Sequence, residues 1–438
     1  LWLNQIMKPP ARFQAAIEII ELCHTQDIPA KAIVAEYLRK RRYIGSKDRR
    51  NIGDTVFAII RDRYYIEWQL SQIGAKACAR ALAFGHLIKI NKSLIGLMPL
   101  FDGAPYSPSA LTQAENTWIP RYLKACKQQP SNMPCWVRGN YPPWLQGELV
   151  KSFGKELIPE MRALNAEAPM DVRVNTTKSN RTSLLKALER NGLNAMPTKY
   201  ARNGIHIFNR PALLTTKEYR EGVMEIQDEG SQIIASLVAA ESGHCVIDFC
   251  AGAGGKSLAM AENCLPNGRI ISCDTSADRL SKMNPRLTRA GIKNVETRQL
   301  KSGTNWLYSA KQSAHRVLVD VPCSGTGTWR RTPDARTGLT PEKLSAYQQN
   351  QSQILDTASA LVKPGGRLIY ATCSVLESEN MGQVQDFLHR QRMFKLIPIG
   401  PIWLEKIGSL DVPVTDTLQL TPRQHGVDGF FIAVFERI

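Results

Sequence analysis

The segment VIDFCAGAGGKS, residues 246–257, decides the fold class of this chain. An apolar strand ends at Asp248, a glycine-rich turn follows, and a helix is expected from Lys256. Two familiar glycine loops are excluded by spacing. A phosphate-binding P-loop requires glycine where Cys250 stands, and a dinucleotide fingerprint requires glycine where Ser257 stands. The segment therefore predicts a strand–turn–helix unit whose backbone can approach a ligand closely.

The same rhythm of apolar strand, loop and helix continues beyond this segment. Further strands are expected at residues 270–274, 317–320 and 367–371, and helices at residues 280–290 and 341–362. Apolar strands that alternate with amphipathic helices are typical of an α/β domain with a doubly wound parallel sheet. We therefore predict such a sheet from about residue 236 onward.

Polar side chains stand where the predicted strands end, at Asp248, Asp274, Asp320 and Cys373. Ligands of doubly wound sheets bind at the carboxyl ends of the strands, so these four side chains are expected to share one site. A carboxylate at Asp274 suits a ribose diol, because it accepts hydrogen bonds from both hydroxyl groups.

Two cysteines follow predicted strands, Cys323 in DVPCSGTG (residues 320–327) and Cys373 in ATCS (residues 371–374). An isolated cysteine is usually a small buried hydrophobe, and we interpret Cys23, Cys78, Cys126, Cys245, Cys264 and Cys273 in this way. A thiolate that adds to carbon 6 of cytosine makes carbon 5 nucleophilic, and an acid near ring nitrogen 3 supports that addition. Asp320 is placed for the nitrogen, and Cys323 is a candidate for the later release step. Methylation of an exocyclic amine requires no thiol.

The part of the chain before this sheet divides into three segments. Residues 1–95 are predicted to form a helical domain, with helices at 11–23, at 30–42 and from Ser46 onward. Residues 96–134 lose periodicity and are predicted to be a linker with a few helical residues around 121–126. Residues 135–235 are predicted to form a small α+β module.

The composition favours a nucleic-acid partner. Lys and Arg number 56 against 39 Asp and Glu, and the net charge of +17 attracts a polyanion. The ten cysteines form no CxxC pair, so neither a metal site nor a disulfide framework is expected. No apolar run reaches membrane-spanning length, and no signal peptide is evident. We expect a cytoplasmic protein, a monomer, that binds no metal and no membrane.

The motifs resemble the Sun (Fmu-type, NSUN-like) family of RNA cytosine-5 methyltransferases, and most of all its bacterial small-subunit rRNA branch. The resemblance covers roughly residue 134 to the end, and further segments carry it besides those above: RVN at 173–175, IQDEGSQ at 226–232, WRRTPD at 329–334, the Glu379-Asn380 pair and DGFF at 428–431. It implies a Rossmann-like methyltransferase domain that uses S-adenosylmethionine to methylate RNA at carbon 5 of cytosine, and the expected RNA is ribosomal RNA or a precursor ribosomal particle.

The resemblance also implies roles for single residues. Cys373 is the nucleophile, Cys323 helps to release the product, and Asp320 is both the nitrogen-3 partner and a cofactor contact; DNA cytosine-5 enzymes take their nucleophile from the Pro-Cys loop instead. The cofactor pocket is implied at Cys250, Ala251, Gly252, Ala253, Gly254, Gly255, Lys256, Asp274 and Asp320. RNA contacts are expected at Arg173, Asn175, Trp329, Arg330 and Arg331.

Two features depart from the family pattern. The family has an acid at the end of the third strand that touches the cofactor's nucleoside, and residues 298–302 (RQLKS) contain none. The amino-terminal helices resemble a NusB-like RNA-binding module through SKDRRNIGDTVFAIIR (46–61), and this likeness fades after about residue 95. The missing acid favours an alternative, a non-catalytic ribosome-assembly factor, whereas the two cysteines with Asp320 and Lys256 favour the enzyme. A nicotinamide-dependent dehydrogenase is excluded by Ser257.

Overall fold

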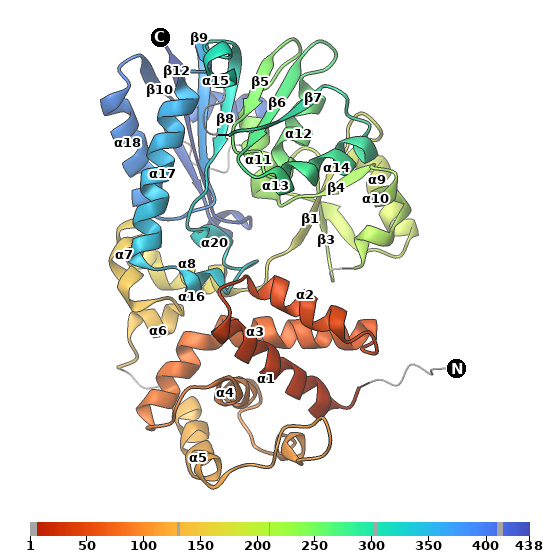
Figure 1. Cartoon of the computed structure of the whole chain (residues 1–438), viewed down its shortest axis with the longest axis vertical. Coiled ribbons are helices and arrows are strands. Elements are labelled where there is room, and N and C mark those ends of the chain that lie inside the picture. The colour runs from red at the N-terminus through yellow and green to blue at the C-terminus, as the bar shows by residue number, and fades with distance from the viewer. Residues whose placement is uncertain (1–6, 129–131, 210, 302–304, 410–414) are drawn as a thin grey trace. The chain divides into compact units, whose positions relative to one another are not determined.

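A computed structural model describes residues 7–128, 132–209, 211–301, 305–409 and 415–438. The chain forms two compact units, which Figure 1 draws with their elements labelled. The first, the helical unit, comprises residues 1–165 together with 331–339; the second, the sheet unit, comprises residues 166–330 and 340–438. This division groups residues 135–165 with the helices, whereas the sequence led us to expect a domain boundary at residue 135. The expected domain boundaries stay a prediction.

The helical unit contains the predicted amino-terminal helices and several more. Its elements are α1 (Pro9–Thr25), α2 (Ala30–Lys40), α3 (Ser46–Gln72), α4 (Ala79–Asn91), η1 (Met98–Phe101), α5 (Gln113–Gln128), α6 (Cys135–Gly139), η2 (Pro143–Leu145), α7 (Gln146–Phe153), η3 (Gly154–Glu156), α8 (Leu157–Asn165) and α16 (Ala335–Gly338). The periodic apolar residues Phe13, Ile17 and Ile20 are buried, as their spacing predicts.

The interval 96–134 differs from the linker that its composition predicts. It contains η1 and the sixteen-residue helix α5, whose Ile119, Tyr122 and Cys126 are buried in the same hydrophobic cluster as α1–α4. Helix α5 carries an internal proline, Pro120, which weakens the sequence pattern of a helix. Tertiary packing of its apolar side chains stabilises this helix, which the local sequence pattern does not predict.

The sheet unit begins with a small α+β module. Its elements are β1 (Met170–Val174), α9 (Arg181–Arg190), β2 (Ala195–Pro197), β3 (Gly204–Ile207), η4 (Leu213–Thr215), α10 (Lys217–Arg220) and β4 (Met224–Ile226). The four strands form an antiparallel sheet in the order β2-β3-β1-β4. Helix α11 (Glu229–Leu237) then leads to the large sheet.

The large sheet has eight strands, seven of them in the order β10-β12-β9-β8-β5-β6-β7, with β11 paired to β12. Its strands are β5 (Cys245–Asp248), β6 (Arg269–Asp274), β7 (Val295–Gln299), β8 (Ala314–Asp320), β9 (Val362–Thr372), β10 (Phe394–Ile397), β11 (Thr417–Leu420) and β12 (Phe430–Arg437). Strands β5–β9 pair in parallel, and β12 pairs antiparallel with β9, β10 and β11.

Helices cover both faces of this sheet, which confirms the doubly wound α/β fold. They are α12 (Gly255–Asn263), α13 (Ala277–Ser281), α14 (Met283–Ala290), α15 (Trp306–Ser309), α17 (Pro341–Ser359), α18 (Met381–Arg390), α19 (Ile399–Lys406) and α20 (Pro422–His425), with the short turns η5 (Thr326–Thr328) and η6 (Glu377–Glu379). Several boundaries differ from prediction. The helix expected at 280–290 is divided at Lys282, so that Pro285 lies in the first turn of α14. Strand β9 begins at Val362 rather than at 367.

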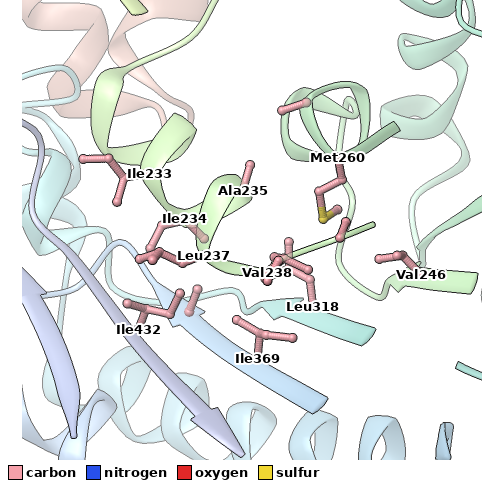
Figure 2. Packing of buried hydrophobic residues seen from close by; sticks show 14 of the residues in the cluster. Ile233, Ile234, Ala235, Leu237, Val238, Val246, Met260, Leu318, Ile369 and Ile432 are labelled. Carbon is pink, nitrogen blue, oxygen red and sulfur yellow. The ribbon is translucent and has the colours of Figure 1, made fainter. Parts of the chain in front are cut away.

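Successive residues of the central strands enter opposite cores. Val246 belongs to the cluster that contains α11 and α12, whereas Ile247 belongs to the cluster that contains α17 and α18. Figure 2 shows the first of these cores, which contains Ile234 and Leu237 of α11 together with Ile369 and Ile432 of the sheet. The two cores fix the sheet from both sides, so its carboxyl edge is a rigid support for a site. In the described part of the chain, no helix is long and apolar enough to cross a membrane.

Candidate active site

The glycine-rich turn between β5 and α12 has the geometry that its glycines predict. Gly254 has φ +81° and precedes the first residue of α12, and an added Cβ there would lie 2.5 Å from the Met283 side chain. Gly252 has φ +55°, and an added Cβ there would meet nothing within 4 Å. Gly254 is therefore required by packing, whereas Gly252 leaves bare backbone next to open space.

Asp274 holds this turn from the next strand. Its Oδ2 accepts the Gly252 N–H at 2.9 Å, and its Oδ1 accepts the Ser276 N–H at 2.8 Å. The side chain is buried, and each carboxylate oxygen has lone pairs beyond the one that these bonds use. Asp274 can therefore order the turn and still accept hydrogen bonds from a ribose.

Lys256, in the first turn of α12, reaches the end of β8. Its Nζ donates to Asp320 Oδ2 at 2.5 Å. Burial alone would lower the pKa of Lys256, but the neighbouring Asp320 carboxylate raises it above its usual value. This ion pair connects the cofactor turn to the strand that leads to Cys323.

Asp248 ends strand β5 beneath both loops. It is fully buried, and its Oδ2 accepts the Ser257 Oγ–H at 2.6 Å. Ser257 Oγ in turn accepts Ser272 Oγ–H at 2.9 Å. Burial raises the pKa of Asp248 to about 7 from the ordinary 3.8.

The two predicted cysteines come together. Cys323 Sγ and Cys373 Sγ lie 3.3 Å apart, and both side chains are half-buried. The Gly327 N–H donates to the Cys373 carbonyl at 2.9 Å, which joins the two loops through the backbone. The hydrogen bond with Cys373, together with burial, raises the pKa of Cys323 well above its usual value.

The carboxyl-terminal DGFF segment supports the Pro-Cys loop from the far end of the sequence. Gly327 and Gly429 are in backbone contact, since an added Cβ on Gly327 would lie 2.1 Å from the Gly429 carbonyl oxygen. The Gly429 N–H donates to the Gly327 carbonyl at 2.8 Å. Arg330 Nε donates to Asp428 Oδ1.

Four of the five residues predicted to contact RNA are buried: Arg173, Asn175, Trp329 and Arg330. Arg173 pairs with Glu262 and donates to Gln227 Oε1 at 3.0 Å. The Asn175 amide donates at 2.9 Å to two carbonyls, those of Gly222 and Ala290. Because side chains bound in this way do not present a surface to RNA, we do not retain these four as RNA contacts. Arg331, which lies in the helical unit, is partly exposed, and its RNA contact stays a prediction.

The end of the third strand carries no acid among its described residues. Strand β7 ends at Gln299, whose Nε2 donates to the Thr275 carbonyl at 3.0 Å. The Leu300 N–H donates to the Asp274 carbonyl at 2.9 Å, so residue 301 follows directly beside the cofactor turn. Ser302, the last residue of the segment that departs from the family, lies outside the described residues.

Sequence comparisons identify the family to which this site belongs. The family model for "16S rRNA methyltransferase RsmB/F" matches residues 235–436, and the model for the RsmF/B-like ferredoxin-like domain matches residues 141–212. Ribosomal RNA small subunit methyltransferase B of Escherichia coli (strain 536) is 31% identical over 408 residues, 89% of this chain and 91% of that protein. The chain belongs to the RsmB/F family of 16S rRNA methyltransferases.

Solved structures agree with this assignment at the level of the fold. A methyltransferase homologue from Pyrococcus horikoshii is 25% identical with a TM-score of 0.60, covering 71% of this chain and 100% of that one. NSun6 from Pyrococcus horikoshii, crystallised with the S-adenosylmethionine analogue SFG, is 20% identical with a TM-score of 0.60, covering 68% and 98%. The predicted Rossmann-like methyltransferase fold is confirmed.

S-adenosylmethionine is the cofactor of this RsmB/F member, and the residues present fit it. The bare backbone at Gly252 faces open space, and the Asp274 carboxylate beside it retains lone pairs for the ribose hydroxyl groups. When bound, the cofactor supplies an electrophilic methyl group on a sulfonium. Reasoning from the sequence assigned no role to Glu379, although its side chain contacts both cysteine loops.

Proposed function

We propose that this RsmB/F member methylates carbon 5 of a cytosine in small-subunit ribosomal RNA, with Cys373 as the nucleophile. The observation that carries the proposal is the pair of thiols, 3.3 Å apart between Sγ atoms, on the two loops next to the Lys256–Asp320 ion pair. Amine methylation has no use for such a pair, whereas carbon-5 methylation requires one group to add to the ring and another to assist elimination. The relatives named for activity on small-subunit rRNA support the choice of RNA.

In this mechanism the thiolate of Cys373 adds to carbon 6 of the cytosine. The ring then takes a proton at nitrogen 3, which Asp320 delivers after receiving it from Lys256 at 2.5 Å. Carbon 5 becomes enamine-like and accepts the methyl group. A base then removes the carbon-5 proton, nitrogen 3 returns its proton through Asp320 to Lys256, and the Cys373 sulfur leaves carbon 6 as a thiolate, which restores the aromatic ring.

Cys323 is proposed to assist the release step rather than the addition. Its Sγ atom lies 3.3 Å from the Cys373 Sγ atom, so Cys323 can exchange a proton next to the sulfur that has to leave. Its position beside the proposed nucleophile fits a group that acts while the adduct on Cys373 is broken down.

The test is a covalent-trapping experiment with full-length protein, S-adenosylmethionine and 16S rRNA. Cys323→Ala is expected to accumulate an RNA–protein adduct that survives denaturation, because addition proceeds and elimination is blocked. Cys323→Ala combined with Cys373→Ala is expected to form none. An adduct that persists in the double variant, or methyl groups found on an amine by nucleoside analysis, would show that this mechanism is wrong.

We also propose that residues 1–95 act as an RNA-binding domain. The exposed basic residues Arg39, Arg42, Lys47 and Arg50 provide a positive surface on α2 and α3 and the turn between them. Replacing all four by Ser should weaken rRNA binding and flatten its salt dependence, while calorimetry shows unchanged S-adenosylmethionine binding. Unchanged rRNA affinity at low and high salt would contradict this role.

A further inference from the structure

One buried carboxylate contacts both of the loops that carry the cysteines. Glu379, the last residue of η6, is fully buried. Its Oε1 accepts the Ser324 N–H at 2.9 Å, and its Oε2 accepts the hydroxyl groups of Ser324 and Ser374, each at 2.5 Å. Ser324 follows Cys323 and Ser374 follows Cys373, so a single side chain is bonded to the residue after each thiol.

A fourth donor joins the same carboxylate to the other side of Cys323. Gln351 of α17 is fully buried, and its Nε2 donates to Glu379 Oε1 at 2.9 Å and to the Pro322 carbonyl at 3.1 Å. The residues before and after Cys323 are thus both fixed by the Glu379–Gln351 pair. The Glu379 backbone is itself held, because the Tyr370 hydroxyl of β9 donates to its carbonyl at 2.6 Å.

The hydroxyl groups around Glu379 extend the connection between the two loops. Ser374 Oγ accepts the Leu376 N–H at 3.0 Å and lies 3.1 Å from Thr326 Oγ1. Thr326 Oγ1 accepts the Val375 N–H at 3.0 Å. The Pro-Cys loop and the Thr-Cys loop therefore share a hydrogen-bond network that contains no exposed member among these residues.

We propose that Glu379 is a positioning residue that sets the spacing between Cys323 and Cys373. It does not reach the reacting atoms; it acts through Ser324 and Ser374, which fix the backbone next to each sulfur. The inference rests on the proposed function, because only a reaction that uses both thiols on one base requires their spacing to be fixed.

A carboxylate is the side chain that this position requires. Each oxygen of Glu379 accepts two hydrogen bonds, so all four donors are satisfied by one group. An amide of the same shape accepts at only one end, and its NH₂ would face two donors. Glu379→Gln therefore preserves the volume but forces at least one loop away from its place.

The first experiment measures the spacing without RNA. Diamide oxidises two thiols to a disulfide and is itself reduced to the hydrazine, taking up the two protons and two electrons that the thiols lose. Because disulfide formation is sensitive to geometry, the Cys323–Cys373 bond, followed by peptide mass spectrometry, should form at least about tenfold more slowly in Glu379→Gln than in the wild type.

A matched control separates positioning from general destabilisation. Glu229 is also a buried carboxylate in the sheet unit, and it accepts two backbone N–H groups, those of Tyr200 and Ala201. Glu229→Gln is expected to lower stability while leaving the rate of the Cys323–Cys373 disulfide unchanged. If Glu379→Gln does not fold, Ser374→Ala, which removes one donor and keeps the carboxylate, is expected to slow the same disulfide.

The second experiment measures the consequence for chemistry. In the Cys323→Ala background, Glu379→Gln should reduce the rate of RNA adduct formation by about 100-fold, the scale for a misplacement of about 1 Å. The dissociation constant of S-adenosylmethionine should change less than about threefold. Rescue is expected from Glu379→Asp only in part, since its shorter side chain reaches fewer of the donors.

The outcomes separate the two proposals. If Glu379→Gln and Ser374→Ala form the disulfide as fast as the wild type, the positioning role is overturned. If the disulfide slows but Cys323→Ala with intact Glu379 yields no RNA adduct, the proposed function fails while the role of Glu379 in thiol spacing stands.

Discussion

The cofactor turn after β5 and the cysteine loops after β8 and β9 lie on the same edge of one sheet, but different bonds hold them. The cofactor turn is shaped by glycines with positive φ and held by separate side-chain bonds, in which Asp274 accepts the Gly252 N–H and Arg286 donates to the Ala253 carbonyl. Buried side chains hold the cysteine loops, through Ser324, Ser374 and Glu379. A single substitution in the cofactor turn should therefore weaken cofactor binding moderately. A single substitution in the cysteine loops should reduce the rate of methyl transfer by orders of magnitude. Lys256 belongs to the first region and acts on the second.

Cys373→Ala should have the largest effect, because it removes the proposed nucleophile from the cysteine loops and leaves the cofactor turn intact. We expect methyl transfer to rRNA to fall by at least about 10⁴-fold, by analogy with the loss of other covalent nucleophiles. The dissociation constant of S-adenosylmethionine should stay within about threefold of the wild type. The exposed Cys78, replaced by Ala, is the control. If cofactor binding is lost together with activity, the two regions are not separable.

Lys256→Met tests the residue that joins the two regions. Methionine keeps most of the length of the side chain, which lies against the Phe430 ring, but removes the proton donor to Asp320. We expect kcat to fall by about 10²–10³-fold, the scale of general acid–base catalysis. Single-turnover kinetics at saturating cofactor measures this. A fall of less than about threefold would mean that the ion pair serves structure alone.

Asp274→Ala, in contrast to Lys256→Met, should weaken the binding of S-adenosylmethionine rather than slow the chemical step. It removes the acceptor for the Gly252 N–H and the expected ribose partner. Loss of hydrogen bonds to a charged group predicts a dissociation constant raised about 10–100-fold. Calorimetry with S-adenosylmethionine tests this, with the exposed Asp278→Ala as control. An unchanged constant would remove Asp274 from the cofactor site.

Sequence patterns predicted the parts of this site that depend on local order. Strand ends follow from apolar runs, so the sequence alone could assign Asp274, Asp320 and Cys373 to one edge of the sheet. The role of Glu379 could not be predicted, because it depends on Ser324, 55 residues earlier, on another loop. The predicted RNA contacts at Trp329 and Arg330 were not retained because the burial of these side chains depends on segments distant in the sequence. The burial of Arg330 is set by the segment at Asp428, which the local sequence does not show.

Asp248 provides a pH test beneath both regions. Its pKa is raised from 3.8 to about 7, so between about pH 4 and pH 7 the folded state holds a proton that the unfolded state has released. The free energy of unfolding should therefore fall as pH rises through this window. We expect the wild type to lose roughly 3 kcal/mol more than Asp248→Asn between these limits. Urea unfolding at several pH values measures this, and parallel curves for the two proteins would contradict it.

Lys301→Asp should have the smallest effect, and it addresses the acid that the third strand lacks. The Leu300 N–H is bonded to the carbonyl of Asp274, whose side chain holds the cofactor turn, and a carboxylate at 301 follows that bond by one residue. We expect the dissociation constant of S-adenosylmethionine to fall by about 3–10-fold through one added hydrogen bond. Lys301→Ala separates this gain from the loss of the positive charge. If both variants bind S-adenosylmethionine equally tightly, the positive charge of Lys301 was what weakened binding in the wild type. The cofactor turn then needs no third-strand acid. If only Lys301→Asp binds more tightly, the turn gains from the same kind of side-chain support that the cysteine loops already have.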